Sequence, residues 1–188
     1  MKAVAKWVMI RLVRTAKQGS YGPIHISCFV SDNNEFYDFT VATLDFIKKT
    51  DARRFKRILK EIDWLVNTRR IKRNCGEYRH KMKLCSVNRE IKEEYSKDDV
   101  VYFSTVLIHE ATHGYLCSRK VEHTKERRAS IERICVAEEN RFLRKVAISY
   151  PKIAEQYYYE FNPDDWDYSF NTSKWKRAYD EMVRIIRS

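Results

Sequence analysis

The segment His109-Glu110-Ala111-Thr112-His113 places two imidazoles and a carboxylate within little more than one helical turn. Residues four apart on an α-helix share a face with their Cβ atoms about 6 Å apart, so both histidine rings can reach one metal ion. Glu110 lies about 100° further round the helix, beside such an ion. Two neutral imidazoles suit Zn²⁺. The pattern therefore predicts a zinc site with His109 and His113 as ligands.

The chemistry that this pattern predicts is hydrolysis. Zn²⁺ lowers the pKa of a bound water to about 7 and polarises a substrate carbonyl. Glu110 would accept the proton of that water as general base and then donate it to the leaving amine. A five-residue motif can also arise by chance. Here it falls within the apolar segment 100–116, where two histidines and a glutamate would be costly to bury without partners.

A third protein ligand is needed to complete the site. No histidine follows at the spacing HExxHxxGxxH, so that arrangement is excluded. Glu132 follows His113 after 18 intervening residues and is our first choice, with Glu139 second and Glu138 or His123 after them. Glu132 and Glu139 are seven residues apart and share a helix face, so one could bind zinc while the other holds a ligand histidine.

The cysteines favour a reducing compartment. Their number is odd and none forms a CxxC pair, which argues against a disulfide framework. Cys117 and Cys135 are interpreted as packing residues, because a small buried hydrophobe is the commoner role of a free cysteine.

Helices and strands that could position the motif are visible in the hydrophobic pattern. Strands are expected over 3–13 and 24–30, with a loop of glycine and proline between them, and 35–42 could either continue a sheet or begin a helix. Apolar residues at helical spacing predict a helix over 52–67. A further strand is expected over 81–88.

The motif itself is expected on a helix over 100–116, with Asp98 and Asp99 as N-cap. A second helix is expected over 124–146 and a last one near 173–187, at the end of a tail rich in tyrosine and tryptophan. We predict that this aromatic tail is packed.

Composition indicates a folded protein. The length of 188 residues fits a single domain, 1–188, with the aromatic-rich helical tail as an extension. The formal net charge of +11 admits a nucleic-acid partner but is also typical of solvated helix faces. No apolar run approaches the roughly 18 residues of a membrane span, and no signal peptide is recognisable. We therefore expect a cytoplasmic protein without a membrane partner.

The region from Val100 to Leu143, with FSTVLIHEATHGYL followed by ASIERICVAEENRFL, resembles the gluzincin branch of the zincin superfamily and small bacterial HExxH proteins of unassigned function. The resemblance covers about a quarter of the chain, and the NExxSD or NEGFA surroundings of the third ligand in larger families are absent. It implies an α+β, zincin-like fold: a small twisted mixed sheet packed on the HExxH helix and a following glutamate helix. Residues 81–88 would be the edge strand that aligns substrate.

The function expected on these grounds is that of a zinc metallopeptidase acting on a protein or peptide. Two alternatives stand beside it: a DNA-associated protease of the SprT-like kind, and a zincin-fold binding or regulatory module with little turnover. His123 would correspond to the third histidine of SprT-like proteases, but it is closer to the motif than their usual spacing.

Overall fold

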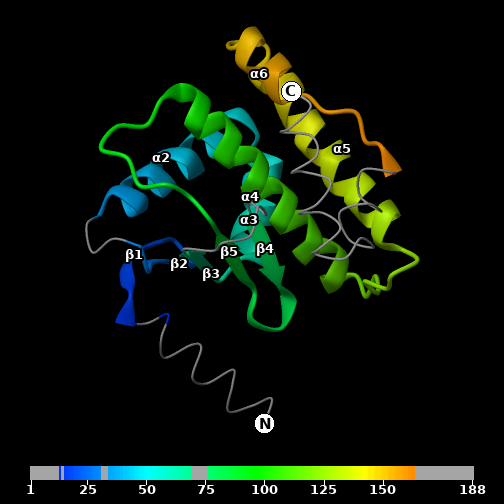
Figure 1. Ribbon diagram of the computed structural model, residues 1–188, viewed down its shortest axis with the longest axis horizontal. Helices are drawn as coiled ribbons and strands as arrows, with labels where there is room; N and C mark the ends of the chain where they lie inside the picture. The colour runs from blue at the N-terminus through cyan, green and yellow to red at the C-terminus, as the bar shows by residue number, and fades with distance from the viewer. Residues whose placement is uncertain (1–12, 14, 31–33, 69–75, 164–188) are drawn as a thin grey trace, which may run out of the picture.

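The structure, a computed structural model, describes residues 13, 15–30, 34–68 and 76–163. Strands and helices follow one another along this part of the chain (Figure 1). In chain order they are β1 (Lys17–Tyr21), β2 (Ile24–Cys28), α2 (Glu35–Thr50), α3 (Ala52–Glu61), β3 (Trp64–Asn67), β4 (Gly76–Arg79), the 3-10 helix η1 (His80–Met82), β5 (Leu84–Val87), α4 (Lys97–Ser118), α5 (Arg128–Val146) and α6 (Pro151–Tyr157).

The strands form one mixed sheet in the order β1-β2-β3-β5-β4. β2, β3 and β5 run parallel, while β1 and β4 pair antiparallel with their neighbours at the two edges. The strand expected over 81–88 is present as β5, but its expected position at the sheet edge is wrong, because β5 is paired on both sides. The edge beside the HExxH helix is β4, and its short sequence around Gly76 lacks the apolar run that marks a strand.

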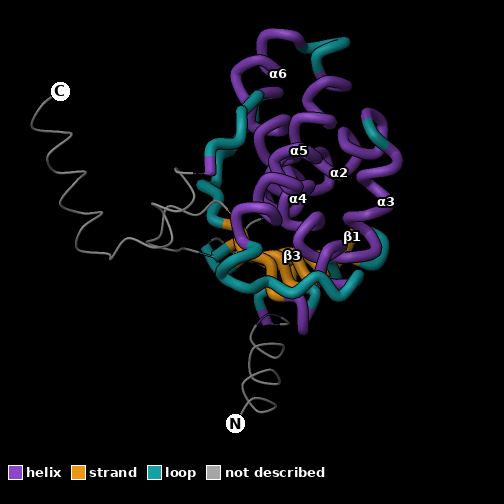
Figure 2. Tube along the Cα trace, turned by 90° about the vertical axis from the view of Figure 1, so that its right-hand side faces the viewer, coloured by secondary structure: helices purple, strands orange, loops and turns teal. Residues whose placement is uncertain are grey.

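The main core lies between the sheet and the helices, which cover the same face of it (Figure 2). Side chains alternate along the central strands. Leu65 and Cys85 point into the helical core, whereas Val66 and Leu84 form a small cluster on the opposite face. This arrangement confirms the expected α+β class.

Several expected boundaries differ from those observed. The helix expected over 52–67 ends at Glu61, and residues 64–67 form β3 instead. A strand buried on both faces gives an apolar run that also fits helical spacing, so periodicity alone could not separate the two. The loop expected before residue 24 contains β1, which pairs with β2 through a tight turn at Gly22.

The expected helix over 100–116 begins earlier, at Lys97, and its N-cap is Ser96 rather than Asp98 or Asp99. The helix expected from 124 begins at Arg128. Residues 35–42, which could have continued the sheet, form the start of α2. The expected strand at 3–13 lies almost wholly outside the described residues, as does the expected helix at 173–187. No helix among the described residues is long and apolar enough to cross a membrane.

Candidate metal centre

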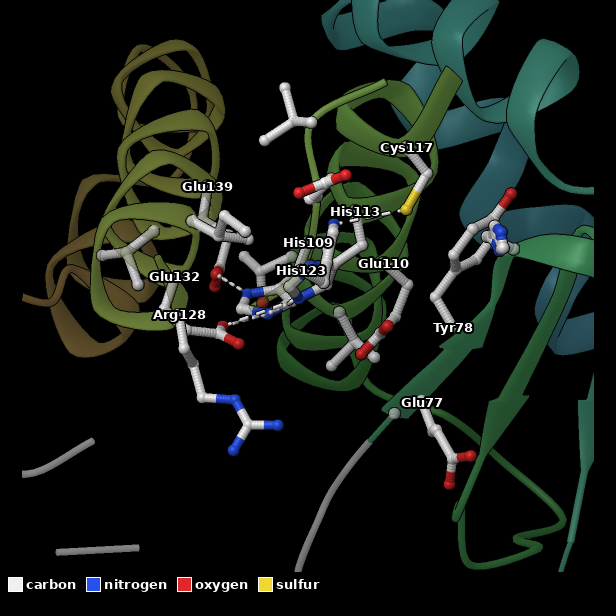
Figure 3. Close-up of a pocket in the computed structure, with 18 of the residues that line it drawn as sticks. Glu77, Tyr78, His109, Glu110, His113, Cys117, His123, Arg128, Glu132 and Glu139 are labelled. Carbon is white, nitrogen blue, oxygen red and sulfur yellow. Dashed lines mark hydrogen bonds and ion pairs between the residues drawn. The ribbon is translucent and has the colours of Figure 1, made fainter. Parts of the chain in front are cut away.

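His109, Glu110 and His113 lie in the middle of α4, which runs between α5 and the sheet edge (Figure 1). The helix begins at a capping box. The Ser96 hydroxyl accepts a hydrogen bond from the backbone N–H of Asp99, and the Asp99 carboxylate accepts one from the N–H of Ser96. These contacts satisfy N–H groups that a helix start leaves unpaired. The two histidines face α5, and Glu110 faces β4 (Figure 3).

Three side-chain atoms converge between α4 and α5. The Nε2 atoms of His109 and His113 are 3.1 Å apart. Oε2 of Glu132, from α5, lies 3.2 Å from the first and 3.5 Å from the second. This carboxylate is buried, and Oε2 has no other hydrogen-bond partner. Two imidazole nitrogens this close can share only one proton, so a cation placed among the three atoms would satisfy all of them.

Glu139 holds His109 from the side away from this convergence. Its Oε1 lies 2.6 Å from Nδ1 of His109. A carboxylate on the outer nitrogen of a metal-binding histidine fixes the tautomer that leaves the inner nitrogen free to bind. The expected division between two glutamates seven residues apart is thus reproduced in the geometry, with Glu132 facing the Nε2 atoms and Glu139 facing Nδ1.

Opposite charges determine the ionisation of this group in the absence of metal. Burial alone would lower the pKa of His109, but hydrogen bonds with Glu132 and Glu139 outweigh it and raise the pKa well above its usual value. Burial would likewise raise the pKa of Glu132, yet its contacts with His109 and His113 lower it. Glu132 is therefore a carboxylate at neutral pH, which is the form that binds a cation.

Cys135 also lies at this centre, one turn after Glu132 on α5. Ligand atoms of His109, His113, Glu132 and Cys135 all lie within 4.8 Å of one another. The sequence interpretation treated this cysteine as packing, and its complete burial agrees with that. Burial and the nearby Glu132 raise the pKa of the thiol, so it remains protonated and is the weakest ligand of the four. A site closed by four protein ligands would leave no position for water.

Glu110 occupies a separate buried position against the first residue of β4. Only 6% of Glu110 is exposed, and burial raises the pKa of its carboxyl group. A Cβ atom at Gly76 would lie 2.5 Å from Oε1 of Glu110. Glycine at residue 76 is thus what gives the carboxylate room. The sequence alone gives no signal for this role of Gly76, because the two residues meet only once the sheet edge is in place.

The remaining ligand candidates, Glu138 and His123, lie outside the convergence of His109, His113 and Glu132. Glu138 is turned away from the histidines and pairs with Arg54 and Arg57 of α3. His123 is in the loop between α4 and α5, where Nε2 is 3.2 Å from Sγ of Cys117 and the ring centroid is 5.4 Å from that of His113. Neither residue belongs to the described metal-binding group.

A cleft of about 1040 Å³ opens over the converging atoms (Figure 3). α4 forms its floor, β4 one wall and α5 the other. It is lined by Gly76, Glu77, Tyr78, His80, Tyr102, Thr105, Val106, His109, Glu110, His113, Cys117, Lys120, Val121, Glu122, His123, Thr124, Arg128, Ile131, Glu132, Val136, Glu139 and Tyr159. His109, His113 and Glu132 therefore line a cleft large enough to admit a ligand.

Comparison with protein-family models, with curated proteins and with solved structures gave no significant match to this chain.

Proposed function

We propose that the protein is a zinc-dependent peptidase, with His109, His113 and Glu132 as the zinc ligands and Glu110 as general base. One observation carries the proposal: two imidazole nitrogens and a buried carboxylate oxygen converge within 3.5 Å on the floor of an open cleft. Two histidines and a glutamate form one of the ligand sets that catalytic zinc uses in peptidases.

The residues fit such an ion in charge as well as in distance. Glu132 contributes a carboxylate, and Glu139 fixes the tautomer of His109 from behind. A bound zinc ion would supply a water acidic enough to attack at neutral pH and would stabilise the negative charge that develops on the carbonyl oxygen. The protonated thiol of Cys135 would leave that water its position.

Glu110 would act on the water from the β4 side of the cleft. Its raised pKa suits a group that accepts a proton from the attacking water and returns it to the leaving amine. β4 supports peptide as the substrate, because the edge of a sheet can bind an extended chain through backbone hydrogen bonds. An antiparallel edge strand next to the HExxH helix also supports the proposed resemblance to the zincin fold.

The first prediction tests metal and reaction together. We expect about one zinc per chain by elemental analysis of purified protein, and cleavage of quenched fluorescent peptides by the wild type. Glu110→Gln should retain the zinc but lose activity by about a thousandfold or more, because the proton acceptor is gone. Glu77→Gln is the matched control, since Glu77 lines the same cleft but is half-exposed and paired with Arg79.

Two results would contradict the proposal. One is wild-type protein that binds no zinc when titrated with it. The other is a Glu110→Gln variant that cleaves peptides as fast as Glu77→Gln does.

A further inference from the structure

A buried ionic network lies on the side of α4 and α5 that faces away from the metal-binding group. Arg54 and Arg57 extend from α3, one turn apart, and both side chains reach the carboxylate of Glu138 on α5. The distances to Oε2 of Glu138 are 3.0 Å from Nη2 of Arg54 and 2.9 Å from Nη1 of Arg57. The network continues to Asp51, which is fully buried and pairs with Arg54 and Lys145.

Arg57 contacts α4, and its guanidinium carbon lies 4.7 Å from the centroid of the Tyr115 ring there. Nη1 of Arg57 also donates to Oγ1 of Thr112, at 3.2 Å, and that hydroxyl in turn donates to the carbonyl oxygen of Ile108. Thr112 is the fourth residue of the HEATH segment and is fully buried. Among the described residues, Arg54 has no polar contact with α4, and its partners are Asp51 and Glu138. Arg57 therefore connects α4 and α5 at once, whereas Arg54 connects α3 and α5.

The two anchor points adjoin the metal centre in sequence. Thr112 precedes His113, and Glu138 precedes Glu139. Consecutive helical residues point about 100° apart, so each anchor faces away from the cleft while its neighbour contacts His109. The distance between Thr112 and Glu138 thus helps to set how close Glu132 and Glu139 come to the histidines, and it also sets the rotation of α5 against α4.

The energetics of the buried ion pair between Arg57 and Glu138 favour a role in positioning the helices over a role in stability. Burying a charge pair costs desolvation that offsets most of its attraction, so such a pair contributes little net stability compared with apolar packing. Its hydrogen bonds nevertheless permit only a narrow range of distance and direction. Burial would raise the pKa of Glu138, but Arg54, Arg141 and Arg57 lower it, so the carboxylate that Arg57 grips stays charged.

We propose that Arg57 is a positioning residue for the metal centre, because a single guanidinium fixes the helix that carries the two histidines against the helix that carries Glu132 and Glu139. The proposal rests on the metal site proposed above, but not on the reaction. It assigns a function to Thr112 and Glu138, neither of which is a metal ligand or reaches the cleft.

The test compares Arg57→Met with Arg54→Met, a control whose side chain is 7% exposed against 11% for Arg57 and which removes a contact with the same carboxylate. We expect both variants to lower the unfolding temperature of the metal-free protein. Only Arg57→Met should weaken zinc binding, by about tenfold, the lower end of the loss seen when residues that orient metal ligands are removed. Zinc dissociation constants would be measured by competition with a chromophoric chelator.

A second pair of variants tests the same contact if Arg57→Met fails to fold. Thr112→Val removes the hydroxyl that Arg57 contacts while preserving volume, and Thr112→Ser restores it. We expect Thr112→Val to weaken zinc binding several-fold and Thr112→Ser to remain close to wild type.

The positioning role would be overturned if zinc binding were unchanged in Arg57→Met or, where that variant does not fold, in Thr112→Val. It would also be overturned if Arg54→Met lost as much zinc affinity as Arg57→Met. Wild-type protein that binds zinc without cleaving peptides would contradict the proposed reaction alone. Wild-type protein that binds no zinc would contradict both proposals.

Discussion

At the scale of single residues, the arrangement around His109 separates the roles of two glutamates that spacing alone could not separate. Glu132 and Glu139 occupy one face of α5, and both contact the same imidazole. Glu132 contacts the nitrogen that faces His113, whereas Glu139 contacts the opposite nitrogen. Removal of a residue that binds the metal should therefore weaken zinc binding more than removal of a residue that orients a ligand.

We predict that Glu132→Ala loses nearly all zinc binding, whereas Glu139→Ala loses about 10- to 100-fold, the range typical of a partner that orients a ligand histidine. Zinc dissociation constants of the two variants, measured under identical conditions, check this order. Glu138→Ala tests the third candidate. Because Glu138 supports the site without binding the metal, this variant should weaken zinc binding less than Glu132→Ala or Glu139→Ala does. If Glu139→Ala lost more zinc binding than Glu132→Ala, Glu139 would be the ligand and Glu132 the residue that orients His109.

Sequence reasoning was most successful where local pattern and chemistry coincide. The HEATH segment lies on a helix, and Glu132 faces both of its histidines from the next one. Contacts made between distant segments could not be predicted. Gly76 meets Glu110 only because β4 pairs with β5 at the sheet edge, and Arg57 meets Thr112 only because α3 packs on α4.

At the scale of secondary-structure elements, predictions failed where the local sequence pattern fits more than one structure. β3 is buried on both faces, so its apolar run carries no alternation that would mark it as a strand. The helix start was misplaced by two or three residues because Ser96, Asp98 and Asp99 are all acceptable caps. The structure selects Ser96, and Asp99 completes the capping box with it.

This capping box gives α4 a stability that depends on pH. Hydrogen bonds with Lys92 and Ser96 outweigh burial and lower the pKa of Asp99 from 3.8 to about 2. Because the folded-state pKa lies below the unfolded one, the contribution is fully present above about pH 4 and is lost as the pH falls toward 2. Asp99→Asn should therefore lower the free energy of unfolding by about 1 kcal/mol at pH 7, the usual value of a cap.

Urea unfolding at pH 7 and pH 3 measures this effect. The difference between wild type and Asp99→Asn should shrink at the lower pH, where the Asp99 carboxyl group binds a proton more readily in the unfolded chain than in the folded one. Glu93→Gln is a suitable control, because it removes one negative charge from the exposed segment just before α4. An equal loss of stability in both variants would indicate a general charge effect instead of a cap.

At the scale of the whole molecule, the excess of basic residues does not extend to the cleft. Lys and Arg outnumber Asp and Glu by 37 to 26, but Arg54 and Arg57 are engaged in buried ion pairs and are not part of a solvated helix face. Among the described residues that line the cleft, five are glutamates, whereas the only lysine and arginine are Lys120 and Arg128. This distribution disfavours a nucleic acid lying across the proposed active site.

We accordingly predict that any binding to double-stranded DNA is non-specific and that DNA does not accelerate peptide cleavage. Attraction based only on net charge depends on counterion release, so binding seen at about 50 mM salt should be lost by about 200 mM. Fluorescence anisotropy of labelled DNA across this range measures it, with heparin as a polyanion that should compete as well as DNA does. A DNA-associated protease would behave differently, because its cleavage would rise when DNA is added and its binding would survive at the higher salt. The lining of the cleft favours the first outcome, since its glutamates outnumber its lysine and arginine and would repel a phosphate backbone.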